Sequence, residues 1–153
     1  MRLTWRQTLV LKVYGWITWA LQPMVRRKLR RRARQGPIYG LHMAQRFGDY
    51  SEVSVPDHPF VWVHAVSLGE TRAASLLLTA LRQRMPGLRL LLTHSTATGW
   101  AQGHSLLRDG DAQAWLPWDT VHATHAFLNH FQPTVGVLME TEVWPQMVQA
   151  CQE

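Results

Sequence analysis

Cysteine is almost absent from this sequence, since Cys151 is the only one among 153 residues. A single thiol excludes an internal disulfide framework and any multi-cysteine zinc or iron–sulfur site, and it favours a reducing compartment. The P-loop, GxGxxG, GxSxG and HExxH motifs are also missing. Three of the eight histidines fall on one predicted helix, but no Asp, Glu or Cys accompanies His122, His125 and His130 at ligand spacing. We therefore expect a solvated helix there, no metal site and no cofactor.

Acidic residues are absent from the first 48 positions. Residues 1–34 hold ten Lys or Arg and no acid, whereas the other 119 residues hold six basic and ten acidic side chains, a net charge of −4. The formal charge of +6 therefore belongs to the N-terminal segment alone. A nucleic-acid-binding fold more often spreads its basic residues over a folded surface, so we expect no nucleic-acid partner.

A long uninterrupted hydrophobic run is missing as well. The apolar, Trp-rich segment from Leu9 to Val25 contains Lys12 and Pro23, and its seventeen residues lie at the short limit for a membrane-spanning helix. Seven basic residues follow it at positions 26–34, the reverse of the order in a cleavable signal peptide. This pattern is typical of a helix at an anionic cytoplasmic membrane surface, where each cation contributes about 1 kcal/mol. A helix packed on the domain with a solvated basic end is the alternative, and spanning or lying flat both remain open.

The rest of the chain alternates between short apolar runs and segments with helical spacing. Apolar residues make up 46% of the sequence, which excludes a disordered chain. After Gly36-Pro37 ends the first helix and a helical turn follows at 41–47, the expected strands are 60–66, 88–93, 112–116 and 135–139. The expected helices are 71–85, 98–107, 121–131 and one from about position 142. This alternation predicts an α/β domain at 36–153 after a basic helix at 1–35, with a parallel sheet covered on both faces and ligands beyond the carboxyl ends of the strands.

Polar residues follow the first of these strands. Gly69 allows a tight turn, and Glu70 lies in the first helical turn, where the helix dipole favours a carboxylate that could take a proton from a substrate hydroxyl. Ser67-x-x-Glu70 has the spacing of a capping box, in which both side chains only satisfy free backbone amides. By spacing alone the capping box is favoured, and the catalytic interpretation stays open.

Two further strand ends carry candidates. Thr96 and Thr98 stand at a helix start, where hydroxyls and free amides can hold an anion, although Thr is also a common helix cap. Glu140 and Glu142 follow the last strand beside Trp144. Acids in a first helical turn are ordinary, but an acid directly after a buried strand is less so.

Together these segments resemble a known family. HAVSLGET (64–71), STATG (95–99), LPWD (116–119), FxxxFxP (127–133) and LMETEVWP (138–145) stand in this order. Their order and intervals are similar to those in the N-terminal half of the bacterial 3-deoxy-D-manno-octulosonic acid (Kdo) transferases, which add Kdo to the lipid A precursor in lipopolysaccharide biosynthesis. The basic helix and residues 46–50 match as well, so the resemblance covers nearly the whole chain.

The resemblance implies an inverting glycosyltransferase of the GT-B type, with two Rossmann-like domains and no metal in the transfer step. It places the catalytic base at Glu70 and an assisting carboxylate at Glu140, with Glu142 as the alternative. Residues expected to bind substrate are Ser67, Gly69, Thr96, Thr98 and Glu142.

The implied partners are the lipid A precursor as acceptor, CMP-Kdo as donor and the cytoplasmic side of the bacterial inner membrane. Because the family has a second domain that carries most of the donor site, we expect these 153 residues to form the acceptor-side domain and to be inactive alone. The alternative is a non-catalytic membrane-surface binding module of the same fold, in which the Ser, Thr and Glu residues act only as caps.

Overall fold

A four-stranded parallel sheet forms the centre of the computed structural model, which describes residues 4–54, 60–140 and 142–153. The strand order is β3-β2-β1-β4, with β1 at Phe60–His64, β2 at Arg89–His94, β3 at Ala112–Trp115 and β4 at Val135–Leu138. The helices that alternate with them are α2 (Leu68–Arg84), α3 (Ala97–His104), α4 (Val121–Phe131) and α5 (Pro145–Ala150). The predicted α/β class with a Rossmann-like parallel sheet is thus confirmed.

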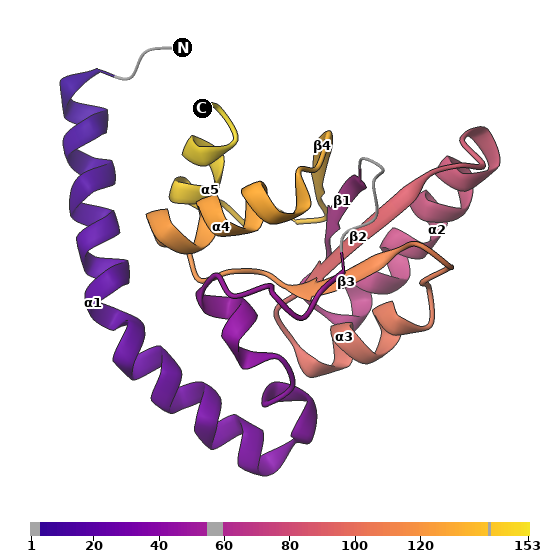
Figure 1. Cartoon of the computed structure of the whole chain (residues 1–153), viewed down its shortest axis with the longest axis horizontal. Helices are drawn as coiled ribbons and strands as arrows, with labels where there is room; N and C mark the ends of the chain where they lie inside the picture. Colours follow the sequence, from indigo (N-terminus) through magenta and orange to yellow (C-terminus); the bar gives the residue numbers. More distant parts are fainter. Residues whose placement is uncertain (1–3, 55–59, 141) are drawn as a thin grey trace.

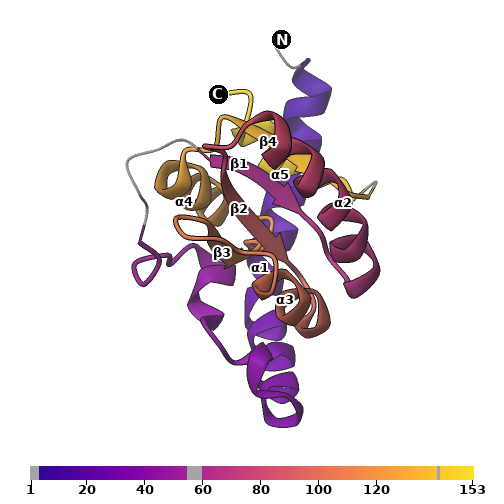
Figure 2. The ribbon, with the colours of Figure 1, turned by 90° about the vertical axis from the view of Figure 1, so that its right-hand side faces the viewer.

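Helices cover both faces of the sheet, as Figure 2 shows, with α4 on one side and α2 and α3 on the other. Side chains of a strand alternate between faces. Phe60 and Trp62 of β1 therefore pack with Phe127 of α4, while Val63 packs with Leu78 of α2. The apolar runs in the sequence are the inner strands β1 and β2, which are buried from both sides.

The last strand departs from the expectation that every strand is buried. Val135 and Leu138 of β4 are largely exposed, although Val137 packs against the cluster under α2. The physical reason is position, because β4 is an edge strand that pairs only with β1 within the described residues. An apolar run alone does not distinguish an edge strand from a central one.

The opposite edge is covered by the segment before β1. This segment holds two short 3₁₀ helices, η1 (Pro37–Tyr39) and η2 (Met43–Phe47). Its Gln45 side chain accepts a hydrogen bond from Trp115 N–H at 2.9 Å, and Arg46 O accepts one from Trp118 N–H at 2.7 Å. The otherwise unpaired backbone at and beyond the end of β3 is satisfied in this way.

A single long helix, α1 (Trp5–Gln35), runs along the outside of α4, α5 and the 37–50 segment (Figure 1). It ends before Gly36 as predicted, but it continues through Pro23. Trp118 Nε1 donates to Thr18 O at 2.9 Å, and Gln146 Nε2 donates to Leu11 O at 2.9 Å. The helix is therefore fastened to the domain.

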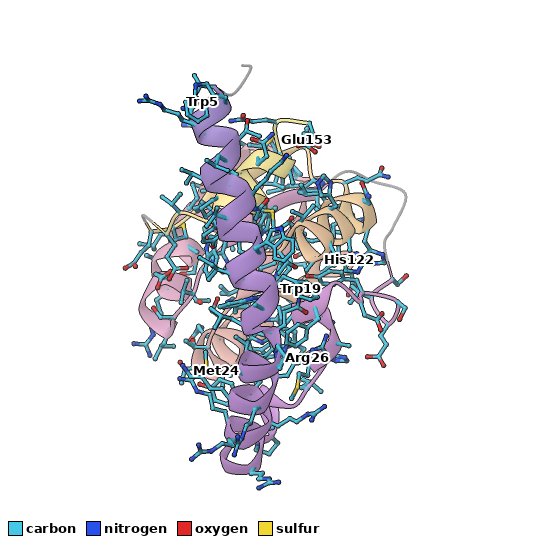
Figure 3. All side chains as sticks on the ribbon, turned by 90° about the vertical axis from the view of Figure 1, so that its left-hand side faces the viewer. Trp5, Trp19, Met24, Arg26, His122 and Glu153 are labelled. Carbon is cyan, nitrogen blue, oxygen red and sulfur yellow. The ribbon has the colours of Figure 1, made fainter. Side chains whose placement is uncertain are left out.

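The exposed surface of α1 differs between the two halves of the helix. Figure 3 looks onto this helix, with Trp5 near its N-terminal end and Arg26 in its second half. In the first half, Trp5, Trp16 and Trp19 are 72%, 74% and 64% exposed. Further exposed apolar side chains of this half are those of Leu9, Val10, Val13 and Ile17, and Met24 follows near the start of the second half. The charged side chains of the second half are all basic and exposed: Arg26, Arg27, Lys28, Arg30, Arg31, Arg32 and Arg34.

Among the residues that the structure describes, no helix has both the length and the hydropathy needed to cross a membrane.

Candidate functional site

The strand order sets the place where a ligand is expected. From β1 the chain moves outward to β2 and β3, and it then returns to place β4 on the other side of β1. In open α/β sheets, ligands bind beyond the carboxyl ends of the strands at such a reversal. The segments that follow β1 and β4 meet there, with Glu70 in the first turn of α2 and Glu142 between β4 and α5.

The carboxylate of Glu70 is held in a fixed orientation at the end of β1. Its Oε2 accepts a hydrogen bond from Val66 N–H at 2.8 Å, and its Oε1 accepts one from Ser67 Oγ at 2.7 Å. Ser67 Oγ also accepts a longer hydrogen bond from Glu70 N–H at 3.4 Å. This is the reciprocal contact of a capping box, with Val66 N–H in place of the amide of the cap itself. A carboxylate has about four acceptor positions, so each oxygen keeps one for a ligand.

Glu142 is the acid that reaches across to β1. Its Oε2 lies 3.8 Å from Nε2 of the buried His64, and neither atom has a hydrogen-bond partner among the described residues. Burial raises the pKa of Glu142, and the nearby charges of Glu70 and Glu140 raise it further. The three carboxylates therefore form one negatively charged cluster at the strand ends.

Glu140 differs from Glu142 in its exposure. It stands two residues after the end of β4 and is exposed to solvent, whereas Glu142 is half-buried. Thr141, which separates them, lies outside the described residues. The two acids of the ETE motif thus differ in burial.

The threonines after β2 also have different surroundings. Thr96 Oγ1 donates to Val66 O at 2.7 Å and accepts from Gly99 N–H at 3.2 Å, so it caps α3 and ties the β2 loop to the β1 loop. Thr98 is exposed, with its hydroxyl 3.4 Å from that of Thr96. The roles of both in substrate binding stay predictions.

The expected tight turn at Gly69 is wrong. The helix α2 begins at Leu68, three residues before the start predicted from the apolar spacing, because Ser67 caps it. Gly69 therefore lies in the first helical turn, and the nearest atom to an added Cβ would be Ser67 Oγ at 3.9 Å. This glycine leaves open space beside Glu70.

No three His, Cys, Asp or Glu side chains are grouped for a metal ion in the parts of the chain that the structure describes. His130 on α4 is half-buried and makes a 2.9 Å hydrogen bond with Val53 O, so the solvated-helix prediction fails for that residue. The exposed His122 agrees with the prediction.

Residues 41–153 match the family model described as 3-deoxy-D-manno-octulosonic-acid transferase (kdotransferase). The chain belongs to the Kdo transferase family.

Curated proteins named as members of this family are similar to the chain. A 3-deoxy-D-manno-octulosonic acid transferase of Bordetella pertussis is 46% identical over 145 residues, which is 90% of this chain and 33% of that protein. The Haemophilus influenzae protein of that name is 34% identical over 74% of this chain and 27% of its own length. A probable mitochondrial member from Arabidopsis thaliana is 30% identical over 92% of this chain and 31% of its own. The chain therefore spans about a third of the length of these three relatives, and no solved structure matches it.

Three further residues lie at or behind the site, and the sequence pattern predicts no role for them. His64 and His94 end β1 and β2, and burial lowers the pKa of each to about 4. Arg46 Nη2 donates to Ser95 O at 3.1 Å, and its guanidinium carbon lies 4.0 Å from the centre of the Trp115 ring. A polar residue that ends an otherwise apolar strand is the signal that points to the two histidines. Local pattern gives no such signal for Arg46.

Proposed function

We propose that this chain is the acceptor-side domain of an inverting GT-B glycosyltransferase that transfers Kdo from CMP-Kdo to the lipid A precursor in lipopolysaccharide biosynthesis. The observation that carries the proposal is the oriented Glu70 carboxylate at the β1 end of the sheet reversal. Relatives named as Kdo transferases support the reaction class.

In this mechanism Glu70 is the general base. It accepts the proton of the primary hydroxyl on the glucosamine of the acceptor, and the oxygen so freed forms a bond to the anomeric carbon of Kdo. The bond from that carbon to the CMP phosphate breaks, so CMP leaves with the electron pair and the configuration inverts. The two hydrogen bonds that hold the Glu70 side chain support this role, because a base must be oriented before its proton arrives.

The assisting carboxylate is better assigned to Glu142 than to Glu140. The anomeric carbon becomes positively charged as CMP departs, and a fixed negative charge in a partly desolvated position stabilises it. Glu142 is half-buried beside His64 and near Glu70, whereas Glu140 is exposed.

A second candidate function is a non-catalytic membrane-surface binding module. The hydrogen bonds of Ser67, Glu70 and Thr96 favour it, because each of these side chains satisfies a backbone group of its own loops or helix. The two candidates differ in whether Glu70 is needed for turnover.

The long helix supports a place at the cytoplasmic side of the inner membrane in either case. The exposed tryptophans of α1 suit the headgroup level of a bilayer, and the basic half suits anionic lipids. Attachment there would bring the site to an acceptor that is itself embedded in the bilayer.

A fusion of residues 1–153 with the remaining two thirds of the Bordetella pertussis relative tests the catalytic proposal. Transfer from CMP-Kdo to lipid A precursor is measured in the parent fusion and in Glu70→Gln. Loss of a general base slows turnover by about 10²–10⁴-fold, whereas loss of a cap costs about 1 kcal/mol of stability and leaves turnover. We expect a folded and nearly inactive variant.

Glu52→Gln is the matched control, because Glu52 is an exposed carboxylate outside the site. It should turn over like the parent. A Glu70→Gln fusion that keeps more than about a tenth of the parent rate would favour the binding module instead. Residues 1–153 without the second domain should give no transfer.

A further inference from the structure

A cavity of about 440 Å³ lies between α1 and the loops that follow the strands. Leu21, Val25 and Leu29 form its wall on α1. Leu116 and Trp118, from the loop after β3, form much of the opposite wall. Volumes of this size are typical of small-molecule sites, and apolar walls of this kind are typical of cavities that hold hydrocarbon.

Every charged side chain that lines the cavity is a cation. Lys28 and Arg32 come from α1, and Arg46 comes from η2, while no Asp or Glu is among the lining residues that the structure describes. Arg46 Nε is buried and has no hydrogen-bond partner among those residues. Burial lowers the pKa of Arg46 to about 10, which still leaves it charged at neutral pH. The cavity therefore offers unsatisfied positive charge beside an apolar surface.

The cavity joins two features already described. Ser95 and Trp144 line it, and they stand next to Thr96 and two residues after Glu142 respectively, so it borders the candidate site. Met24 of α1 (labelled in Figure 3) lines it too and is 61% exposed, so the cavity reaches the exposed apolar surface of that helix. A molecule held here would extend from the surface of α1 to the carboxyl ends of the strands.

We infer that this cavity binds one acyl chain of an anionic lipid, with the lipid phosphate against Lys28, Arg32 and Arg46. The apolar walls favour the hydrocarbon of an acyl chain. The lining cations, with no acid among the described lining residues, favour a negatively charged head group. The identification of that lipid as the acceptor rests on the proposed function. The binding itself does not depend on it.

Dodecyl phosphate, used below its critical micelle concentration, is the probe. Its affinity for the 153-residue chain is measured by calorimetry beside those of inorganic phosphate and dodecyl maltoside. We expect one site for dodecyl phosphate, at least about tenfold tighter than for either comparison ligand. Equal affinity for inorganic phosphate would leave only an anion site, and equal affinity for dodecyl maltoside would leave only an apolar cavity, and either result overturns the inference.

A matched pair of double variants locates the site. Lys28→Gln with Arg32→Gln removes two lining cations, and Arg30→Gln with Arg34→Gln removes two cations of the same helix that do not line the cavity. All four side chains are exposed, so the fold should survive. We expect the first pair to weaken dodecyl phosphate binding about tenfold and the second to leave it unchanged. Equal effects of the two pairs, or none from the first, would contradict the assignment.

The proposal that an acyl chain occupies the cavity is tested by Leu21→Trp, which fills the cavity. Ile17→Trp is the control, because Ile17 is exposed and does not line the cavity. Only the first should weaken binding, and equal binding by both would overturn it. If the cavity does not bind dodecyl phosphate in this way, the Kdo-transfer experiment with the fusion protein still tests the proposed function independently. Intact dodecyl phosphate binding in a fusion that transfers no Kdo would count against the proposed function alone.

Discussion

Two buried histidines at the ends of neighbouring strands are kept neutral by their surroundings. His64 Nδ1 lies 2.9 Å from Thr93 Oγ1, and His94 Nδ1 lies 2.8 Å from Ala65 O. Burial is the main reason that the pKa of each falls to about 4. The second ring nitrogen of each has no hydrogen-bond partner among the described residues. A proton added there would create a buried charge without a hydrogen bond of good geometry.

These histidines should make the fold sensitive to acid. Their folded pKa of about 4 lies below the ordinary value of 6.5, so the unfolded chain binds more protons between these limits. The contribution of the two histidines to the free energy of unfolding is therefore complete above about pH 6.5 and is lost as the pH falls through about 4. We expect each histidine to contribute on the order of 3 kcal/mol to this free energy. Urea unfolding curves recorded between pH 7 and pH 4 would measure the loss.

The His94→Asn variant should flatten that pH dependence, because the amide can still donate to Ala65 O but does not titrate. His122→Asn is the control, since His122 is exposed. Identical slopes for His94→Asn and the parent would show that His94 is not the group responsible.

The acidic cluster predicts a pH effect on turnover in the fusion protein. If Glu142 acts as a carboxylate, activity falls as the pH drops through its raised pKa. The charge of Glu140 contributes to that elevation. Glu140→Gln should therefore move the acid limb of the kcat profile to lower pH, while Glu52→Gln should leave it in place. A limb that stays fixed or moves upward in Glu140→Gln would argue against Glu142 as the assisting group.

At the scale of elements, the LPWD segment joins parts of the chain that lie far apart. The buried Asp119 accepts hydrogen bonds from Gln146 N–H at 3.1 Å and from Met147 N–H at 2.9 Å, so it caps the start of α5. Burial, and then this carboxylate, raise the pKa of the Tyr14 phenol of α1. The motif thus holds α1 and α5 against the loop that precedes α4, and its acid is used for structure.

The contact between α3 and β2 depends on a residue without a side chain. A Cβ at Gly103 would lie 2.2 Å from Nε2 of the buried His94 and 2.8 Å from Nε2 of Gln113. Gly103→Ala should therefore destabilise the fold by about 1–3 kcal/mol, although Ala is by itself the better helix former by about 1 kcal/mol. Gly87→Ala is the control, because nothing lies within 4 Å of a Cβ there. Urea midpoints that rise in Gly103→Ala would show that α3 moves away freely.

At the scale of the whole molecule, α1 gives the domain a surface that is apolar at one end and basic at the other. We expect the chain to bind anionic vesicles and to lose most of that binding between about 0.1 M and 1 M salt, because the screening length falls from about 10 Å to 3 Å. Flotation of the protein with vesicles measures this, and uncharged vesicles are the comparison. Vesicle binding that does not depend on salt concentration, and that persists after the seven basic residues at positions 26–34 are neutralised, would exclude an electrostatic contribution to binding.

Much of the architecture could be read from the sequence because it rests on local interactions. Apolar runs bounded by turn residues predicted the four strands within one or two residues, and the helix at 121–131 was predicted with its actual bounds. The spacing of Ser67 and Glu70 predicted the capping contact, which depends only on neighbours within one helical turn. In each case the partners lie within a few positions of each other.

Contacts between residues that lie far apart in the sequence could not be predicted from local pattern. Only the packed fold places Glu142 beside His64, 78 positions earlier in the chain, and leaves Glu140 in solvent. Trp118 reaches Thr18 across 100 residues, and the cation-lined cavity exists because this contact holds α1 beside the strand ends. Periodicity reports which face of an element is apolar, but it carries no information about which distant residue faces it. The sequence by itself therefore determined the elements, the caps and the order of the motifs, and the tertiary structure decided which acid, which cations and which apolar walls meet.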